Sequence, residues 1–217
     1  MTPTIAALSQ VPPFAKGLVK DIRVRWALEE LGLPYDEFLV DSTSKDGADY
    51  RAWQPFGQVP AYRDGEVTLF ESGAIVLYIA QRDTSGVLAP REANGNARVA
   101  TWILAALNSM EPFVESIVVA RLVFGEEPWG KDYEARATEM LKVRLAALAK
   151  WLGDKPYLED RFTAGDLMMA SVLRNVDDGL LEACPALAAY RARCVARPAF
   201  ARALEGQLAT FARAEAA

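Results

Sequence analysis

The stretch that decides the fold of this chain is QVPAYRDG at residues 58–65, followed by LFESGAI at residues 69–75. The β-type runs on either side of the Asp-Gly pair predict a tight hairpin. Ser72 then opens an apolar run with helical spacing, so we expect a helix over 72–82. The pattern brings exposed backbone groups of a strand beside a helix N-terminus, which suits both ends of a small zwitterionic peptide.

The composition is that of an ordinary soluble globular protein. The 217 residues are 52% hydrophobic and 24% charged, which allows one large or two small domains. The net charge of -5 argues against a nucleic-acid partner. The first nine residues lack the cationic region of a secretory signal, and apolar stretches fall short of the roughly 20 residues of a membrane span. We therefore expect a cytoplasmic protein without a membrane partner.

The absence of histidine excludes several chemistries. Neither a Ser-His-Asp nor a Cys-His arrangement can form, and no histidine-based zinc site is possible, so no metal is expected. The two cysteines, Cys184 and Cys194, do not form a Cys-x-x-Cys motif. We interpret both as small hydrophobic residues buried in a helical region.

The first 82 residues alternate between strand and helix signals. Strands are expected over 4–8, 38–40, 59–62 and 67–70, with helices over 18–31 and 72–82 and a short helix within 41–54. Gly32 and Pro34 end the first helix, since glycine suits a left-handed cap and proline cannot continue the helix. The order is β-α-β-(α)-β-β-α, a βαβ unit followed by a ββα unit.

Strand signals vanish after residues 83–92, which have the composition of a linker. The later segments are helical by period or composition: 97–113, 133–152, 164–173 and 187–193. The sequence therefore predicts an α/β domain at 1–82, a linker at 83–92 and an all-helical domain at 93–217.

In this setting the PFGQVPA segment at 55–61, together with LFESGAI at 69–75, resembles the glutathione-binding signature of cytosolic glutathione S-transferases. It is most similar to phi-class and related bacterial members. Residues 26–35 resemble the family's first helix and its exit, and residues 162–166 resemble the cap of a core helix. The resemblance covers nearly the whole chain. It implies a thioredoxin-like N-terminal domain, a C-terminal helical bundle, and a cytoplasmic homodimer that acts in detoxification.

The resemblance also implies how glutathione is held. A cis bond before Pro60 would turn the Val59 N–H and C=O outward to pair with the cysteinyl backbone. Gln58 matches a position whose side chain helps hold the ligand. Lys45 lies near the place of a lysine that meets the glycyl carboxylate, although a solvated surface lysine is equally compatible with the spacing.

The start of the expected 72–82 helix would hold the other end of the peptide. Free N–H groups and the helix dipole attract an anion, so Ser72 would contact the γ-glutamyl carboxylate. Glu71 would face the ligand's ammonium group. Simple helix capping by serine is the structural alternative, and both roles can hold together.

A second capping pattern has a structural interpretation. Thr163 and Asp166 are spaced as in the capping box, in which both side chains satisfy backbone donors at a helix start. We therefore expect Asp166 to serve folding rather than chemistry.

Catalysis requires a group that stabilises the glutathione thiolate. The family usually places a Ser, Tyr or Cys between its first strand and first helix, where this chain reads SQVPPFAKGLVK over 9–20. Ser9 is the one hydroxyl there and is a candidate by elimination, and Lys16 could act electrostatically. A backbone N–H near Gly17 or Leu18 is the third candidate.

The function that the resemblance implies is transfer of the glutathione thiolate to a small electrophile. A glutathione-dependent isomerase or dehalogenase, or a non-catalytic glutathione-binding protein, remains an alternative. The first helix of the helical domain could line the electrophile site, with candidates Trp102, Leu107, Asn108, Met110, Glu111 and Phe113. An apolar helix face belongs more often to a core than to a pocket, so the sequence singles out no residue for this role.

Overall fold

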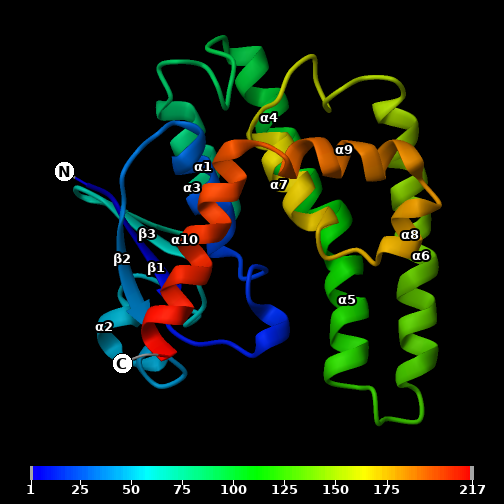
Figure 1. Ribbon diagram of the computed structural model, residues 1–217, viewed down its shortest axis with the longest axis horizontal. Helices are drawn as coiled ribbons and strands as arrows, with labels where there is room; N and C mark the ends of the chain where they lie inside the picture. Colours follow the sequence, from blue (N-terminus) through cyan, green and yellow to red (C-terminus); the bar gives the residue numbers. More distant parts are fainter. Residues whose placement is uncertain (1, 216–217) are drawn as a thin grey trace. The chain divides into compact units, whose positions relative to one another are not determined.

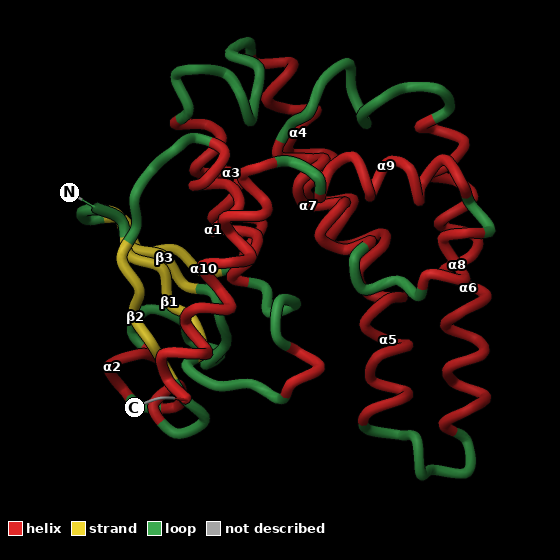
Figure 2. The backbone as a smooth tube through the Cα atoms, viewed as in Figure 1, coloured by secondary structure: helices red, strands yellow, loops and turns green. Residues whose placement is uncertain are grey.

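A four-stranded sheet organises the first part of the chain in the computed structural model, which describes residues 2–215. The strands are β1 (Thr4–Leu8), β2 (Asp36–Val40), β3 (Ala61–Asp64) and β4 (Val67–Phe70). Their order is β2-β1-β3-β4. Figure 2 shows the sheet in yellow, with β1, β2 and β3 labelled. β1 and β2 are parallel, whereas β3 is antiparallel to both β1 and β4. This is the expected βαβ unit followed by a ββα unit.

Helices cover both faces of the sheet. The helices between and after the strands are η1 (Pro13–Ala15), α1 (Asp21–Glu30), η2 (Ser44–Asp46), α2 (Ala48–Arg51) and α3 (Ser72–Arg82). On one face, Ala6 packs in a buried cluster with Val40, Tyr50 of α2 and Ala61. Because side chains alternate along a strand, the fully buried Ile5 lies on the other face, where α1 and α3 pack.

The chain divides by its contacts into two units. One consists of Met1–Asn96 with Ala196–Ala217, and the other of Ala97–Val195. The last helix, α10 (Pro198–Glu215), therefore groups with the sheet, where it packs against α1 (Figure 1). The predicted division had assigned α10 to the helical part.

The regular elements of the second unit are all helices among its described residues. Its elements are α4 (Ala93–Ala105), which begins in the first unit, η3 (Ala106–Met110), α5 (Glu111–Leu122), α6 (Gly130–Leu152), α7 (Ala164–Leu173), α8 (Asp178–Glu182) and α9 (Pro185–Val195). η3 is a short π-helical segment between α4 and α5. Pro112 follows it and cannot donate a hydrogen bond to the Asn108 carbonyl, which accounts for the local change in pairing.

The cap of α7 is the predicted one. The Thr163 hydroxyl accepts from the Gly165 N–H, and the Asp166 carboxylate accepts from the Thr163 N–H at 2.9 Å. The same carboxylate also accepts from the Leu158 N–H at 2.8 Å and from the Tyr190 hydroxyl at 2.9 Å. The expected capping box is confirmed, and the role of Asp166 in folding rather than in chemistry stays a prediction.

The strand expected over 59–62 is β3 at 61–64, and α8 and α10 were not among the expected helices. Three further details differ from the sequence-based expectations. The first helix begins at Asp21 rather than at residue 18, because Gly17 adopts a left-handed conformation (φ 81°) that interrupts the chain before it. Cys194 is buried as expected, but Cys184 is only half-buried. Both are free thiols.

The third detail concerns the helical run Ala93–Leu122. By length and hydropathy alone it could cross a membrane, contrary to the expectation that no stretch is long enough. Individual apolar stretches in it are short, and the helix joins them into one run. Within the second unit α5 packs on α6 and η3 packs on α7.

Candidate functional site

The β-hairpin brings the two predicted binding segments to the same end of the sheet. Ala61 pairs with Phe70, so the residues just before β3 lie beside those just after β4. The chain enters this place at Val59-Pro60 and leaves it at Glu71-Ser72. Because β1 runs antiparallel to β3, the chain leaving β1 at Ser9 reaches the same end of the sheet. The register therefore gathers the segments that the sequence analysis singled out.

The segment before β3 is held by side chains of α2 and its exit. The bond between Val59 and Pro60 is cis, as predicted. The Tyr50 hydroxyl donates to the Gln58 carbonyl at 2.6 Å, and burial raises the pKa of Tyr50 to about 12, so this donor stays protonated. The side-chain oxygen of the buried Gln54 accepts from the Phe56 N–H at 2.6 Å. These contacts leave the Gln58 side chain exposed.

The start of α3 has an unusual backbone. Glu71 precedes the helix with φ 69° and ψ 116°, a conformation that non-glycine residues adopt at a cost, often at functional sites. Its side chain is exposed and makes no capping hydrogen bond, so it leaves the first N–H groups of α3 uncapped by a side chain. Ser72 is the first helical residue and is 6% exposed.

The Ser72 hydroxyl faces a buried cation that the sequence analysis missed. Nη1 of Arg23 donates to it at 3.1 Å, and Arg23 is only 2% exposed. Arg23 comes from α1, so two helices bring positive charge and N–H groups to one place. The available signal was the alternation of Asp21, Arg23 and Arg25 with apolar residues at the start of the helix, since buried charges require partners.

Lys45 lies in η2, directly after β2, at the same end of the sheet because β2 is parallel to β1. Its ammonium group is 2.8 Å from Asp46, whose other oxygen accepts from Arg51 at 2.5 Å. Gly57 packs against this cluster, and a Cβ there would lie 2.8 Å from the Arg51 guanidinium carbon. The surface lysine thus belongs to an ion-pair group beside the segment that leads to Val59.

The loop from Ser9 to Lys20 contains the candidate thiol-stabilising groups. The Ser9 N–H donates to the Val40 carbonyl at 2.8 Å, and its hydroxyl has no hydrogen-bond partner within residues 2–215. Nζ of Lys16 is 2.6 Å from Glu215 of α10. The Leu18 N–H donates to the Ala15 carbonyl at 3.0 Å. Lys16 and the Leu18 N–H are therefore already engaged.

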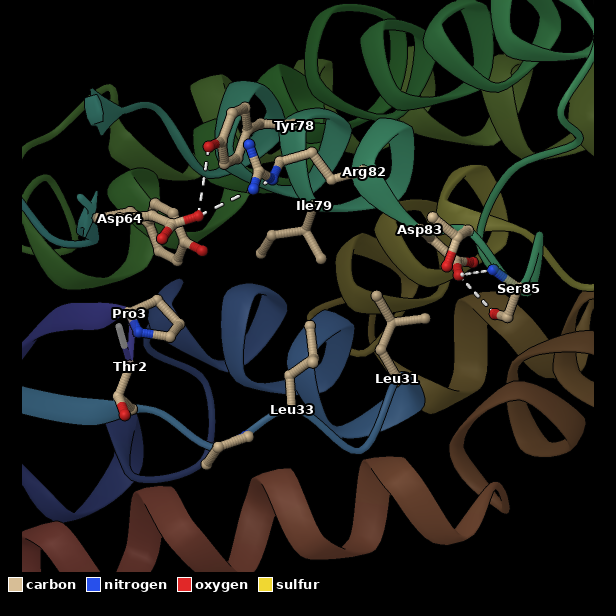
Figure 3. Close-up of a pocket in the computed structure, with 13 residues that line it drawn as sticks. Thr2, Pro3, Leu31, Leu33, Asp64, Tyr78, Ile79, Arg82, Asp83 and Ser85 are labelled. Atoms are coloured by element: carbon tan, nitrogen blue, oxygen red, sulfur yellow. Dashed lines mark hydrogen bonds and ion pairs between the residues drawn. The ribbon is translucent and has the colours of Figure 1, made fainter. Parts of the chain in front are cut away.

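A cavity of about 630 Å³ lies at the opposite end of α3 (Figure 3). Leu31, Leu33 and Ile79 contribute apolar surface, and Asp64 accepts from the Tyr78 hydroxyl at 3.3 Å. Arg82 lies 3.9 Å from the same carboxylate. None of the predicted glutathione contacts is among the residues that line this cavity, so it is separate from the site built by Val59 and Ser72.

The fold and the comparisons with known proteins agree on the class of protein. A thioredoxin-like sheet domain is followed in the chain by a helical domain. The family described as "Glutathione S-transferase, N-terminal domain" matches residues 17–81. Glutathione S-transferase 3 of Zea mays is 33% identical over 193 residues, covering 82% of this chain and 86% of the relative. The chain therefore belongs to the glutathione S-transferase family.

Further relatives extend this result. Glutathione S-transferase 4 of Zea mays is 30% identical over 193 residues, which are 82% of this chain and 83% of that protein. A glutathione transferase family member from Pseudomonas fluorescens, solved with two glutathione molecules bound, is 25% identical with a TM-score of 0.81. That comparison covers 94% of this chain and 92% of the solved one. The expected fold class is thus confirmed.

Proposed function

We propose that this protein binds glutathione at the end of the sheet formed by Val59-Pro60 and Ser72, and transfers its thiolate to small electrophiles. The observation that carries the proposal is the contact of the buried Arg23 guanidinium with Ser72 at the start of α3, next to the cis Val59–Pro60 bond. Family membership supports glutathione as the peptide. The wording of the motif favours a phi-like binding site.

The γ-glutamyl end of the ligand would bind at α3. Its carboxylate would accept hydrogen bonds from the first N–H groups of the helix and from the Ser72 hydroxyl, with Arg23 as the charged partner behind. The exposed carboxylate of Glu71 would then face the ligand's ammonium group. The unusual backbone of Glu71 is consistent with a residue held in place for binding rather than for stability.

The middle of the peptide would pair with Val59 as an added strand does, through backbone N–H and C=O. Gln58 would contact the ligand through its exposed side chain. Lys45 would meet the glycyl carboxylate, for which it would need to exchange its contact with Asp46. That exchange is inexpensive because both groups are on the surface.

For the thiol we propose Ser9. Its hydroxyl is uncommitted among the described residues, whereas Lys16 and the Leu18 N–H already have partners. The hydroxyl would donate a hydrogen bond to the sulfur and thereby lower the thiol pKa, with the thiol proton passing to solvent. The thiolate then forms a bond to the electrophilic carbon while the leaving group departs with its electron pair.

Calorimetry and turnover together test this proposal. Wild-type protein should bind glutathione, and Ser72→Ala should weaken binding about tenfold because one hydrogen bond to a carboxylate is lost. Ser85→Ala, in the loop after α3, is the matched control and should bind normally. Absence of binding in the wild type would refute the proposal. Binding without turnover of a chloro-dinitroaromatic or a panel of other electrophiles would refute the transferase part and favour the non-catalytic alternative.

The remaining attributions rest on the family. We propose a cytoplasmic homodimer that acts in detoxification, as the resemblance implies. Sedimentation at micromolar concentration should give twice the mass of the 217-residue chain. A monomer would contradict the dimer without affecting the glutathione site itself.

A further inference from the structure

We propose that α10 holds residues 16–20, called here the approach segment, in place in front of α1, and that Gln207 is the positioning residue. The approach segment leads into α1 and belongs to the loop that carries the candidate thiol-stabilising groups. The inference deepens the proposed function, on which its chemical consequence rests. Its structural part can be tested without any ligand.

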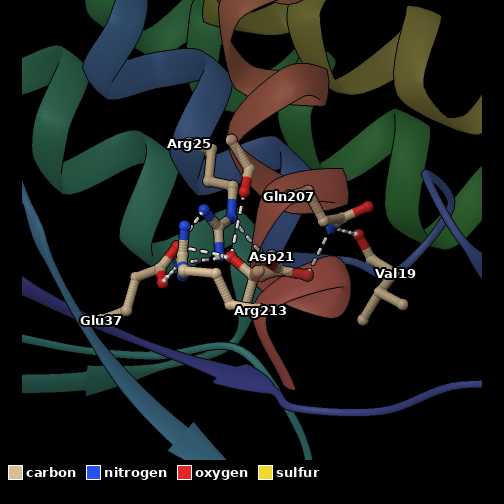
Figure 4. Close-up of polar contacts among 8 residues, drawn as sticks. Val19, Asp21, Arg25, Glu37, Gln207 and Arg213 are labelled. Atoms are coloured by element: carbon tan, nitrogen blue, oxygen red, sulfur yellow. Dashed lines mark hydrogen bonds and ion pairs between the residues drawn. The ribbon is translucent and has the colours of Figure 1, made fainter. Parts of the chain in front are cut away.

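The contact itself is made by one amide group. Gln207 is completely buried on α10, and its Nε2 donates to the Val19 carbonyl at 3.0 Å and to Oδ1 of Asp21 at 2.6 Å (Figure 4). Val19 lies in the approach segment and Asp21 is the first residue of α1. The end of the loop and the start of the helix are therefore tied to a residue almost 190 positions later in the chain.

The other atom of the same amide shows which partners set its orientation. Oε1 of Gln207 is buried and has no hydrogen-bond partner within residues 2–215. Only the amide nitrogen is used, and it satisfies two acceptors at once. The orientation of the amide is therefore set by Val19 and Asp21.

An ion cluster fixes the partner of Gln207. Oδ2 of Asp21 accepts from Nε of Arg25 at 2.7 Å, and Arg25 in turn reaches Glu37 of β2 at 2.6 Å. The Thr210 hydroxyl, one turn after Gln207, donates to the same Glu37 oxygen at 2.7 Å. Arg213 contacts the other oxygen of Glu37. Because both Asp21 oxygens are used, its carboxylate cannot rotate away from Gln207 without breaking the cluster.

A second contact with the approach segment, an ion pair, lies at the end of α10. Nζ of Lys16 is 2.6 Å from Glu215, two turns of helix beyond Gln207. The two ties therefore hold both ends of the approach segment, about 12 Å apart along α10. The Lys16 pair is partly exposed, so we expect it to contribute less than the buried amide.

The position of the approach segment matters for the site because α1 is held from two sides. α10 contacts Asp21, and two residues later Arg23 contacts Ser72 of α3. If the contact to α10 is lost, the approach segment can shift relative to Ser72. The loop that carries Ser9 would then be held only at its other end, where the Ser9 N–H donates to the Val40 carbonyl.

Hydrogen exchange of the unliganded protein tests the structural part. In Gln207→Met the amides of residues 16–20 should exchange about tenfold faster than in wild type, because two hydrogen bonds are removed. Arg202→Gln is the control, since it removes a contact of α10 with Glu29 at the other end of α1, at 2.7 Å, and leaves the approach segment and the ion cluster untouched. Equal exchange in Gln207→Met and wild type would overturn the proposal.

If Gln207→Met fails to fold, Glu215→Gln replaces it in the test. Glu215 is exposed, so this variant should fold normally. It should accelerate exchange of the same amides about twofold. Unchanged exchange in that variant would then overturn the proposal. These measurements need no glutathione, so they distinguish failure of this inference from failure of the proposed function.

The chemical part is read from the pKa of the bound thiol, followed by thiolate absorbance. In Gln207→Met this pKa should rise by about one unit while affinity for S-methylglutathione changes less than about twofold. A role limited to stability would leave the thiol pKa unchanged, and that result would overturn the positioning role. Wild-type protein that binds no glutathione would refute the proposed function instead, and hydrogen exchange would still decide the role of α10.

Discussion

Two regions meet at the end of the sheet and are built in different ways. The segment from Val59 to Ser72 is shaped by neighbours in sequence: a hairpin with a fixed register, a cis proline and a helix start. The loop from Ser9 to Lys20 has little structure of its own beyond the η1 turn and is tied to α10 near the end of the chain. The binding region is therefore encoded locally, whereas the region expected to activate the thiol depends on long-range contacts.

The largest expected effect is on folding. It tests whether the capping box of α7, which is encoded locally, contributes to stability and not to glutathione binding. Asp166→Ala removes a carboxylate that accepts hydrogen bonds from Leu158, Thr163 and Tyr190, so the free energy of unfolding should fall by about 3 kcal/mol. Denaturant unfolding measures this, with the exposed Asp160→Ala as control. Well below its melting temperature the variant should still bind glutathione normally. A protein of wild-type stability would contradict the capping role.

Arg23→Gln tests whether glutathione binding needs the Arg23 guanidinium, which α1 contributes to the binding region. Removing a buried cation beside Ser72 should weaken glutathione binding by about 2 kcal/mol, or roughly thirtyfold. Calorimetry at low ionic strength measures it. Arg82→Gln, at the other end of α3 beside the cavity of Figure 3, is the matched control. Equal losses in both variants would argue against an anion site at the start of α3.

Ser9→Ala probes the other region of the comparison. Turnover should fall about tenfold and the bound-thiol pKa should rise by about one unit, because the hydrogen bond to the sulfur is lost. Glutathione affinity should hardly change, since Ser9 is not among the predicted peptide contacts. Ser116→Ala serves as control, because Ser116 lies in α5 and its hydroxyl donates to the Pro112 carbonyl of the same helix at 2.7 Å. If turnover is unaffected, the thiol is stabilised by another group of the loop, such as Lys16 released from Glu215.

The smallest expected effect is on the stability of the ion cluster around Glu37 at acidic pH. Burial opposes ionisation of Glu37, but hydrogen bonds from Thr210 and Arg25 outweigh it and hold the pKa below its ordinary value of 4.5. Since the folded-state pKa is the lower one, this stability is present above pH 4.5 and is lost as the pH falls through the folded-state pKa. Glu37→Gln should flatten the dependence of stability on pH in this range, because the variant has no carboxyl group to titrate there. An unchanged dependence would show that the ion cluster does not hold α10 to the sheet.

The same contrast explains what could be predicted from the sequence. The hairpin, the 72–82 helix and the α7 cap depend on residues within a few positions, and periodicity and turn chemistry indicate them directly. Arg23 was missed because its partner, Ser72, lies 49 positions away. Gln207 and the grouping of α10 with the sheet were missed for the same reason, since an amphipathic helix does not reveal which surface it covers. The π-helical segment before Pro112 could not be predicted, because the hydrophobic pattern of a sequence does not indicate a local change in backbone hydrogen-bond pairing.

The grouping of α10 with the sheet has a consequence for synthesis of the chain. Residues 97–195 form a unit that is complete before the last helix has been made. Asp21 and Arg25 are synthesised early, yet part of their polar environment, Gln207 and Thr210, is supplied by residues of α10 that follow them by more than 180 positions. Until α10 has been made, these charges and the apolar surface that α10 covers stay exposed. The sheet domain is therefore finished only after residues 97–195 have been made.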